Sequence, residues 1–160
     1  ACAIGASREE NARLMAGVYA SRGLSALVFR GAHSGLDELT TTDVNQVWIV
    51  TGGAVTPTQF DARESLGMAS STIADLAGGE AADNAAVARD VLSGGGADAV
   101  RDAVALNVGA GILAWEGLET PVTEEDFEQR MRGAVERALG ALADGDGARL
   151  IERWVAASNA

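Results

Sequence analysis

The chain has 160 residues, of which 48% are hydrophobic and 22% charged, a composition typical of one soluble globular domain and not of disordered or fibrous protein. Its formal net charge of -11 disfavours nucleic acid and anionic lipid surfaces as partners, and no apolar run approaches the roughly 20 residues that a membrane-spanning helix needs. All twelve cationic side chains are arginine, and there is one cysteine and one histidine, which excludes lysine-based chemistry, disulfide frameworks and Cys/His zinc modules. Any chemistry must therefore depend on carboxylates, hydroxyls, arginine and backbone groups.

The N-terminal segment predicts a strand, a helix and a second strand. Residues 1–5 are apolar, and Ser7-Arg8-Glu9-Glu10 fits a capping box that begins a helix running to about Arg22. Gly23 stands where a helix commonly ends in a left-handed residue. The continuous apolar run 26–30 is typical of a strand covered on both faces. This spacing predicts a βαβ unit with a parallel pair of strands.

The first residues of the chain indicate whether it is a whole protein and where it is located. It opens with Ala1, not Met, and enters an apolar stretch directly, so we expect an excerpt of a longer protein. It shows neither the charged nor the apolar segment of a signal peptide, and we therefore expect a cytoplasmic protein.

A loop and a hairpin follow the second strand. Residues 31–38 form the predicted loop, and the threonine run 40–42 leads to a strand over 46–50. A Thr-Gly-Gly turn then joins this strand to 54–56, which can pair with it as a hairpin. The segment 57–71 has little periodicity, so we expect a loop with a short turn.

The remainder predicts four helices, over 80–93, over about 98–115, from a Thr123 cap onward, and from about Asp146. The second is apolar nearly all round, so we expect a central buried helix in which Gly109 and Gly111 allow close backbone approach. The third has one apolar stripe and the last presents an apolar face. The stripe comprises Phe127, Met131, Val135, Ala138 and Leu142, and the last face Leu150, Ile151, Trp154 and Val155.

These elements predict an α/β fold with a partial, mostly parallel sheet flanked by helices, in a single domain over 1–160. Two or three strands cannot satisfy both edges of a parallel sheet or cover five helices. We therefore expect part of the sheet to be missing from this chain.

The loop Gly31-x-x-x-Gly35-Leu36-Asp37-Glu38 carries the clearest chemical signal. It follows a strand at the end where open α/β sheets bind ligands, and its glycines let a ligand approach the backbone. Asp37 and Glu38 supply the hard oxygen ligands that suit Mg²⁺ when substrate phosphates and water complete the shell. The alternative is that both are solvated loop charges, because acidic glycine loops are common.

At this loop the sequence resembles the anthranilate phosphoribosyltransferase family, and the likeness spans nearly the whole chain in the right order. Members show a strand, a glycine loop with Leu-Asp-Glu and a Ser/Thr-rich stretch, preceded by a strand and helix and followed by two signature helices. The matching segments are Ala26–Gly31, Gly35–Leu39 and Thr40–Thr42 at the loop, Ala3–Gly5 and Leu14–Val18 before it, and Leu76–Glu80, Asn84–Ala86 and Arg101–Asn107 after it.

The resemblance implies the fold shared by nucleoside phosphorylases and these phosphoribosyltransferases, and transfer of a phosphoribosyl group from phosphoribosyl diphosphate to anthranilate in tryptophan biosynthesis. It also implies that Asp37 and Glu38 bind Mg²⁺ on the diphosphate. It covers about the C-terminal half of a family member, so we expect the C-terminal part of a larger glycosyltransferase catalytic domain.

The family's donor-phosphate loop, its anthranilate-binding arginine and its dimer-forming helical domain correspond to sequence upstream of Ala1. We therefore expect the isolated chain to lack turnover, and a homodimer to form only with the missing N-terminal region.

Two alternatives stay open, a nucleoside phosphorylase-like enzyme fragment and a non-catalytic folded fragment that only packs against a partner. The Leu36-Asp37-Glu38 sequence favours the transferase over the phosphorylase. The motif also departs from the family, because Arg30 stands where many members have His; alternatively, His33 matches that His with a shifted alignment.

Other residues have structural interpretations. We expect His33 to be a solvent-exposed loop side chain and Cys2 to be a small core residue. Asn107 lies in a predicted buried helix, so its side chain needs hydrogen-bond partners. The acidic start of the third helix, 124–126, is interpreted as a solvated first turn. The three tryptophans, Trp48, Trp115 and Trp154, are predicted to be packing groups on apolar stripes.

Overall fold

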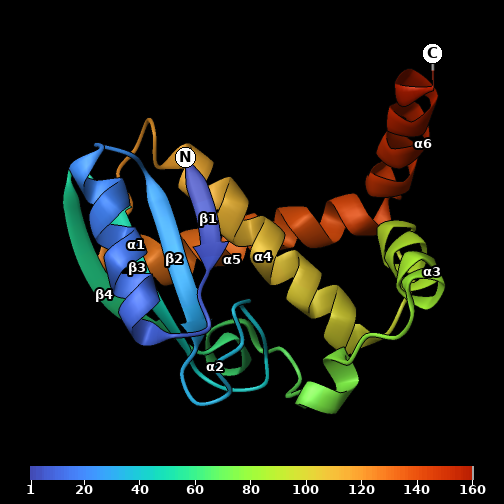
Figure 1. Ribbon diagram of the computed structural model, residues 1–160, viewed down its shortest axis with the longest axis horizontal. Coiled ribbons are helices and arrows are strands. Elements are labelled where there is room, and N and C mark those ends of the chain that lie inside the picture. Colours follow the sequence, from blue (N-terminus) through green and yellow to red (C-terminus); the bar gives the residue numbers. More distant parts are fainter. Residues whose placement is uncertain (160) are drawn as a thin grey trace.

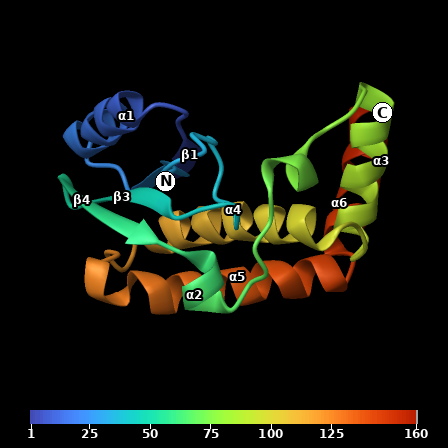
Figure 2. The same cartoon turned by 90° about the horizontal axis from the view of Figure 1, so that it is seen from below.

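The computed structural model describes residues 1–159 and has three layers (Figures 1 and 2). Helix α1 covers one face of a four-stranded sheet, and the long helices α4 and α5 cover the other. The elements are β1 (Cys2–Gly5), α1 (Glu9–Ser21), β2 (Ala26–Gly31), β3 (Asn45–Thr51), β4 (Ala54–Phe60), α2 (Ala62–Leu66), the 3-10 helix η1 (Ile73–Leu76), α3 (Ala81–Leu92), α4 (Asp98–Glu116), α5 (Glu124–Ala143) and α6 (Asp146–Ser158).

The sheet is mixed, with the order β1-β2-β3-β4. The predicted βαβ unit is confirmed, because β1 and β2 are parallel and α1 connects them. The predicted hairpin is also confirmed, since β3 and β4 are antiparallel. The prediction of a mostly parallel sheet is wrong, because β2 and β3 are antiparallel as well. Their connection contains no crossover helix, so the chain simply reverses direction.

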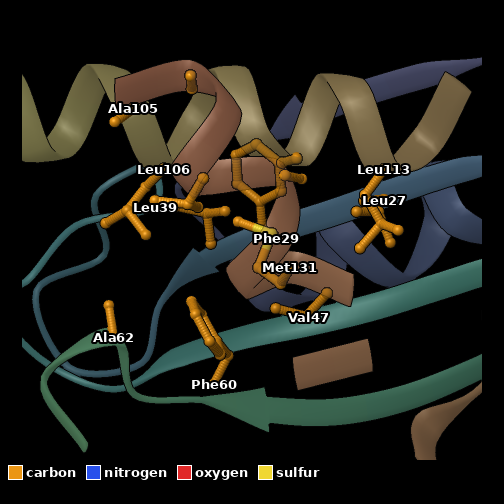
Figure 3. Close-up of a cluster of buried hydrophobic side chains, with 14 of the residues drawn as sticks. Leu27, Phe29, Leu39, Val47, Phe60, Ala62, Ala105, Leu106, Leu113 and Met131 are labelled. Carbon is orange, nitrogen blue, oxygen red and sulfur yellow. The ribbon is translucent and has the colours of Figure 1, made fainter. Parts of the chain in front are cut away.

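A hydrophobic core lies on each face of the sheet, and successive side chains of β2 alternate between the two. Ala26 and Val28 pack towards α1, while Leu27 and Phe29 pack towards α4 and α5. Figure 3 shows the larger of these cores, in which side chains of the sheet, the β2–β3 loop, α4 and α5 meet. Burial on both faces explains the continuous apolar run of this strand.

Helix α1 ends as predicted but begins differently. Gly23 follows it with a positive φ of 64°, the left-handed conformation that favours glycine. The predicted capping box at Ser7 is wrong: the residue at the cap is Arg8, which makes no side-chain capping bond. The start of α1 is therefore held by packing and not by a hydroxyl cap.

The segment 57–71 contains more structure than its weak periodicity predicts. Strand β4 continues to Phe60, whose ring packs edge-to-face on Phe127 of α5 with centroids 5.6 Å apart. Pro57 is tolerated because β4 is an edge strand. Asp61 then caps the short helix α2 by accepting from the Arg63 backbone N–H.

Helix α5 matches its prediction, whereas α4 matches only on one side. Thr123 caps α5 in a capping box with Asp126, and the whole predicted stripe is buried. In α4, Gly109 lies against Val135 of α5, as expected, but Gly111 has open space beside it. The prediction that α4 is buried on all sides is wrong, because its outer side exposes Val108 and Trp115.

Helices α3 and α6 form an arm beyond the free side of β1, called here the α3–α6 arm (residues 81–92 and 146–158; Figures 1 and 2). Val91 attaches α3 to the main core. The predicted packing role is wrong for Trp115 and Trp154, which are exposed, and is confirmed for Trp48 in the sheet. Within residues 1–159, no helix has both the length and the apolar character needed to cross a membrane.

Candidate functional site

The acidic loop lies where the parallel strands β1 and β2 end. Because parallel strands share a direction, their carboxyl ends meet at one edge, where α/β sheets bind ligands. Gly5, the last residue of β1, touches the backbone of Asp37 so closely that a Cβ at this position would overlap the Asp37 carbonyl. The start of the acidic pair is therefore fixed against the end of β1.

A third carboxylate, that of Asp43, shapes the loop before the acidic pair. Asp43 accepts hydrogen bonds from the backbone N–H groups of His33 and Ser34, both at 2.7 Å. The Ser34 hydroxyl accepts from the Leu36 N–H at 3.3 Å, and the Gly31 N–H donates to the Leu36 carbonyl at 2.8 Å. Sequence reasoning did not identify Asp43, because nothing in its neighbourhood shows that it folds back over the loop.

Asp37 and Glu38 both lie at the surface, and neither has an ion-pair partner among the residues that the structure describes. The pKa of Glu38 is raised, first by partial burial of its carboxyl group and then by the negative charge of Asp37. Two adjacent carboxylates concentrate negative charge, which favours a bound cation.

Glu38 borders a cavity of about 600 Å³ between the loop and α4, called here the α4 cavity. Its wall is mainly apolar, and Glu38, Thr40 and Asn107 supply the polar side chains. The remaining lining residues are Leu36, Leu76, Val100, Ala103, Val104 and Val108. A cavity of this size can hold a small organic molecule beside the carboxylates.

The segment after the acidic pair is held by two asparagines. Asn107 of α4 accepts from the Leu39 N–H at 3.1 Å and donates to the Leu39 carbonyl at 2.9 Å. Asn45 accepts from the Thr40 N–H at 3.1 Å and donates to the Thr40 carbonyl at 2.9 Å. The expected hydrogen-bond partners of Asn107 are thus confirmed.

The polar contacts of Arg30 and His33 are with residues other than the acidic pair. Arg30 donates to the Gln46 side chain at 2.6 Å and to the Ala32 carbonyl at 3.2 Å. The His33 side chain is 83% exposed, which confirms its prediction, and its ring nitrogen lies 3.7 Å from Asp43. Neither side chain completes the site. Cys2, at the other end of β1, is half-buried and directs its thiol towards the Tyr19 hydroxyl at 3.4 Å.

The donor set fits a hard divalent cation that shares its ligands with a substrate. Over the described residues 1–159, no group of three or more His, Cys, Asp or Glu side chains is arranged to enclose a metal. Mg²⁺ is often held by only one or two carboxylates, with water and substrate phosphate oxygens completing six ligands. Asp37 and Glu38 could supply two such carboxylate ligands.

Comparison with known proteins extends this description. The family model described as "Glycosyl transferase family, a/b domain" matches residues 2–148. An anthranilate phosphoribosyltransferase from Arthrobacter sp. (strain FB24) is 46% identical over 156 residues, covering 98% of this chain and 42% of the relative. Another from Nocardioides sp. (strain ATCC BAA-499 / JS614) is 46% identical, covering 98% of this chain and 43% of the relative.

Solved structures agree with this result. The anthranilate phosphoribosyltransferase of Thermus thermophilus superposes with a TM-score of 0.79 and 32% identity, covering 98% of this chain and 42% of that one. The Saccharomyces cerevisiae enzyme, solved in complex with PRPP and Mg, gives 0.76 at 20% identity, covering 94% and 40%. At that identity only the fold is comparable. The chain spans about two fifths of the length of these proteins.

Proposed function

Since the chain belongs to the glycosyl transferase family, as its α/β domain, we propose that it supplies the metal-binding acidic loop of an anthranilate phosphoribosyltransferase. The reaction transfers a phosphoribosyl group from phosphoribosyl diphosphate to anthranilate, in tryptophan biosynthesis. The observation that carries the proposal is the placement of Asp37 and Glu38 together at the carboxyl end of a parallel strand pair, beside a cavity. The 46% identity to a curated relative supports the same substrates.

Asp37 and Glu38 would hold Mg²⁺ in this proposal. The ion, when bound, supplies positive charge that neutralises the diphosphate leaving group. The residues of this chain then have three tasks. The two carboxylates bind the cation, the backbone contacts at Gly5 and Leu39 position the segment that carries them, and the apolar wall of the α4 cavity offers a surface for the organic part of a substrate.

We also infer that residues 1–160 form the C-terminal part of a larger catalytic domain. Strand β1 lies at the edge of the sheet, and α4 and α5 extend past it towards the α3–α6 arm (Figure 1). This leaves an open strand edge beside helices that could cover further strands. Turnover would then require the donor-phosphate loop of the rest of the protein, and a homodimer would require its helical domain.

A chimera tests the proposed function directly. Residues 1–160 would replace the matching segment of the Arthrobacter relative, and anthranilate consumption would be followed by its fluorescence in the presence of phosphoribosyl diphosphate and Mg²⁺. We expect the chimera to be active, and Asp37→Asn with Glu38→Gln to weaken the use of the Mg-bound donor, because amides are poorer ligands for a hard cation.

The outcomes of this test are distinct. A folded chimera without activity would contradict the transferase assignment. Unchanged kinetics of the double variant across a Mg²⁺ titration would show that the two carboxylates are only loop charges. The isolated chain is the control, for which we expect no product.

A further inference from the structure

The side chain of Asn107 uses its hydrogen-bonding capacity on backbone groups. Its Oδ1 accepts from the Leu39 N–H at 3.1 Å, and its Nδ2 donates to the carbonyls of Leu39, at 2.9 Å, and Ala103, at 2.8 Å. Both amide hydrogens are thereby occupied, which fixes the orientation of the carboxamide. Asn107 thus joins α4 to a loop 68 residues earlier in the sequence.

The loop residue that Asn107 holds comes directly after Glu38. Leu39 is buried in the main core, and the next residue, Thr40, is held in the same two-sided manner by Asn45. In the part of the chain that the structure describes, no backbone hydrogen bond is made by Asp37 or Glu38 themselves. The position of the acidic pair therefore depends on its neighbours along the chain.

Resting on the proposed function, we propose that Asn107 is a positioning residue that fixes the Glu38 carboxylate for cation binding by pairing with the backbone of Leu39. Asn107 and Glu38 line the same cavity, so both residues border one space. On the other side, the Asp37 carbonyl abuts Gly5. The backbone on either side of the pair is thus held, by the end of β1 at Asp37 and by α4 at Leu39.

The chain contains a second asparagine with the same chemistry and no such neighbour. Asn84 accepts from the Gly79 N–H at 2.8 Å and donates to the Gly79 carbonyl at 3.0 Å. This clamp is exposed, spans only five residues and lies at the start of α3. Asn84 therefore provides a matched control for the loss of an asparagine clamp without an effect on the acidic pair.

The experiment uses the 160-residue chain and Mn²⁺ as a paramagnetic substitute for Mg²⁺. Isotope-labelled protein is titrated with Mn²⁺ in the presence of inorganic diphosphate, which supplies the phosphate oxygens that complete the ligand shell. The broadening of backbone amide signals gives both the location and the Kd of binding. Asn107→Ser is the informative variant, because a serine hydroxyl can still bond to the carbonyl four residues earlier, that of Ala103, but is too short to reach Leu39.

We expect the amides of Asp37 and Glu38 to broaden in the wild type, and Asn107→Ser to raise the Mn²⁺ Kd roughly tenfold, the usual effect of removing a group that orients a metal ligand. Asn84→Ser, the same substitution at the control position, should leave the Kd unchanged. A folded Asn107→Ser variant with wild-type affinity would overturn the positioning role while leaving the metal site intact. A wild type without broadening at residues 37 and 38 would refute the metal site itself, and with it this inference.

A measurement on the wild type alone keeps the inference falsifiable if Asn107→Ser does not fold. Because cation and clamp would restrict the same segment, saturating Mg²⁺ should slow hydrogen exchange at the Leu39 amide and not at the Gly79 amide. Unchanged exchange at Leu39, in protein that binds the cation, would show that Asn107 serves only to attach α4.

Discussion

The main core and the α3–α6 arm use apolar residues in opposite ways. Between the sheet and the helices α4 and α5, large apolar side chains are buried, and Leu106 is fully buried. On the arm, Leu150, Trp154 and Val155 of α6 remain exposed, although their spacing gives the helix an apolar face. The same helical periodicity therefore predicts which side of a helix is apolar but not what covers that side.

The core therefore determines the stability of this chain, whereas the arm presents an exposed apolar surface. The core residues stabilise this chain by themselves, whereas the exposed face of the arm contributes little unless something covers it. Substitutions in the two regions should therefore differ sharply in their effect on the free energy of unfolding.

The largest difference is expected between two leucines. Leu106→Ala should lower the free energy of unfolding by about 3 kcal/mol, because it leaves a cavity in the main core. Leu150→Ala, at a position 55% exposed, should change it by less than about 0.5 kcal/mol. Urea denaturation of both variants gives the comparison. Equal losses would show that α6 is packed as tightly as α4.

Two glycines of α4, one packed and one open, allow the same comparison of buried and exposed positions within one helix. A Cβ at Gly109 would lie 2.7 Å from a Val135 methyl group and 3.2 Å from the Val135 nitrogen, so Gly109→Ala should cost about 1–3 kcal/mol by overpacking. Gly111 has open space beside it, so Gly111→Ala should raise stability by about 0.5–1 kcal/mol through reduced backbone entropy. Thermal unfolding would measure both. Stabilisation by both substitutions would contradict the close packing of α4 on α5.

Asp61, which caps α2 at the edge of the core, is expected to make a pH-dependent contribution to the free energy of unfolding. Its pKa is lowered chiefly by the side-chain hydrogen bond from Arg63, against partial burial, which raises it. A carboxyl group whose pKa is lower in the folded state stabilises the protein fully above its unfolded pKa of about 3.9 and loses this effect as the pH falls through the folded value.

Asp61→Asn keeps an oxygen that can accept from the Arg63 N–H but removes the charge. We expect a loss of about 1 kcal/mol above roughly pH 5 that disappears in acid, measured by urea denaturation across pH. The exposed Asp98, which pairs with Arg101 on α4, offers the control Asp98→Asn, with little change expected. A loss at Asp61 that is constant across pH would assign the effect to the cap and not to the ion pair.

The smallest effect on stability is expected at Trp154, which is 72% exposed. Trp154→Phe should leave the unfolding transition unchanged but remove much of the tryptophan emission that iodide quenches. Trp48→Phe should instead remove emission that iodide does not reach, because Trp48 is buried between the sheet and α1. Protection of Trp154 in the wild type would show that a second molecule covers the arm in solution.

Local features of the fold were predictable from the sequence. Apolar runs, the glycine at 23 and the Thr123 cap each act over a few residues, and all three appear where expected. The direction of β3 was not predictable, because it depends on whether a 13-residue connection crosses the sheet or reverses. The end of β4 depends on Phe60 meeting Phe127, a contact between residues distant in sequence.

The candidate site divides in the same way. Asp37 and Glu38 are adjacent in sequence, so their pairing and the chemistry it favours could be predicted. The groups that hold them, Gly5, Asp43 and Asn107, come from three other parts of the chain. Only the folded arrangement shows that these residues act on one loop.

The direct contact between Gly5 and Asp37 links assembly to ion affinity. No flexible side chain separates the edge strand β1 from the Asp37 carbonyl, so a sideways shift of β1 would move the backbone that carries the first carboxylate. We therefore expect a polypeptide that pairs with the free edge of β1 to change the affinity for the divalent ion. Titration of the ion would in turn report whether the strand has gained a neighbour.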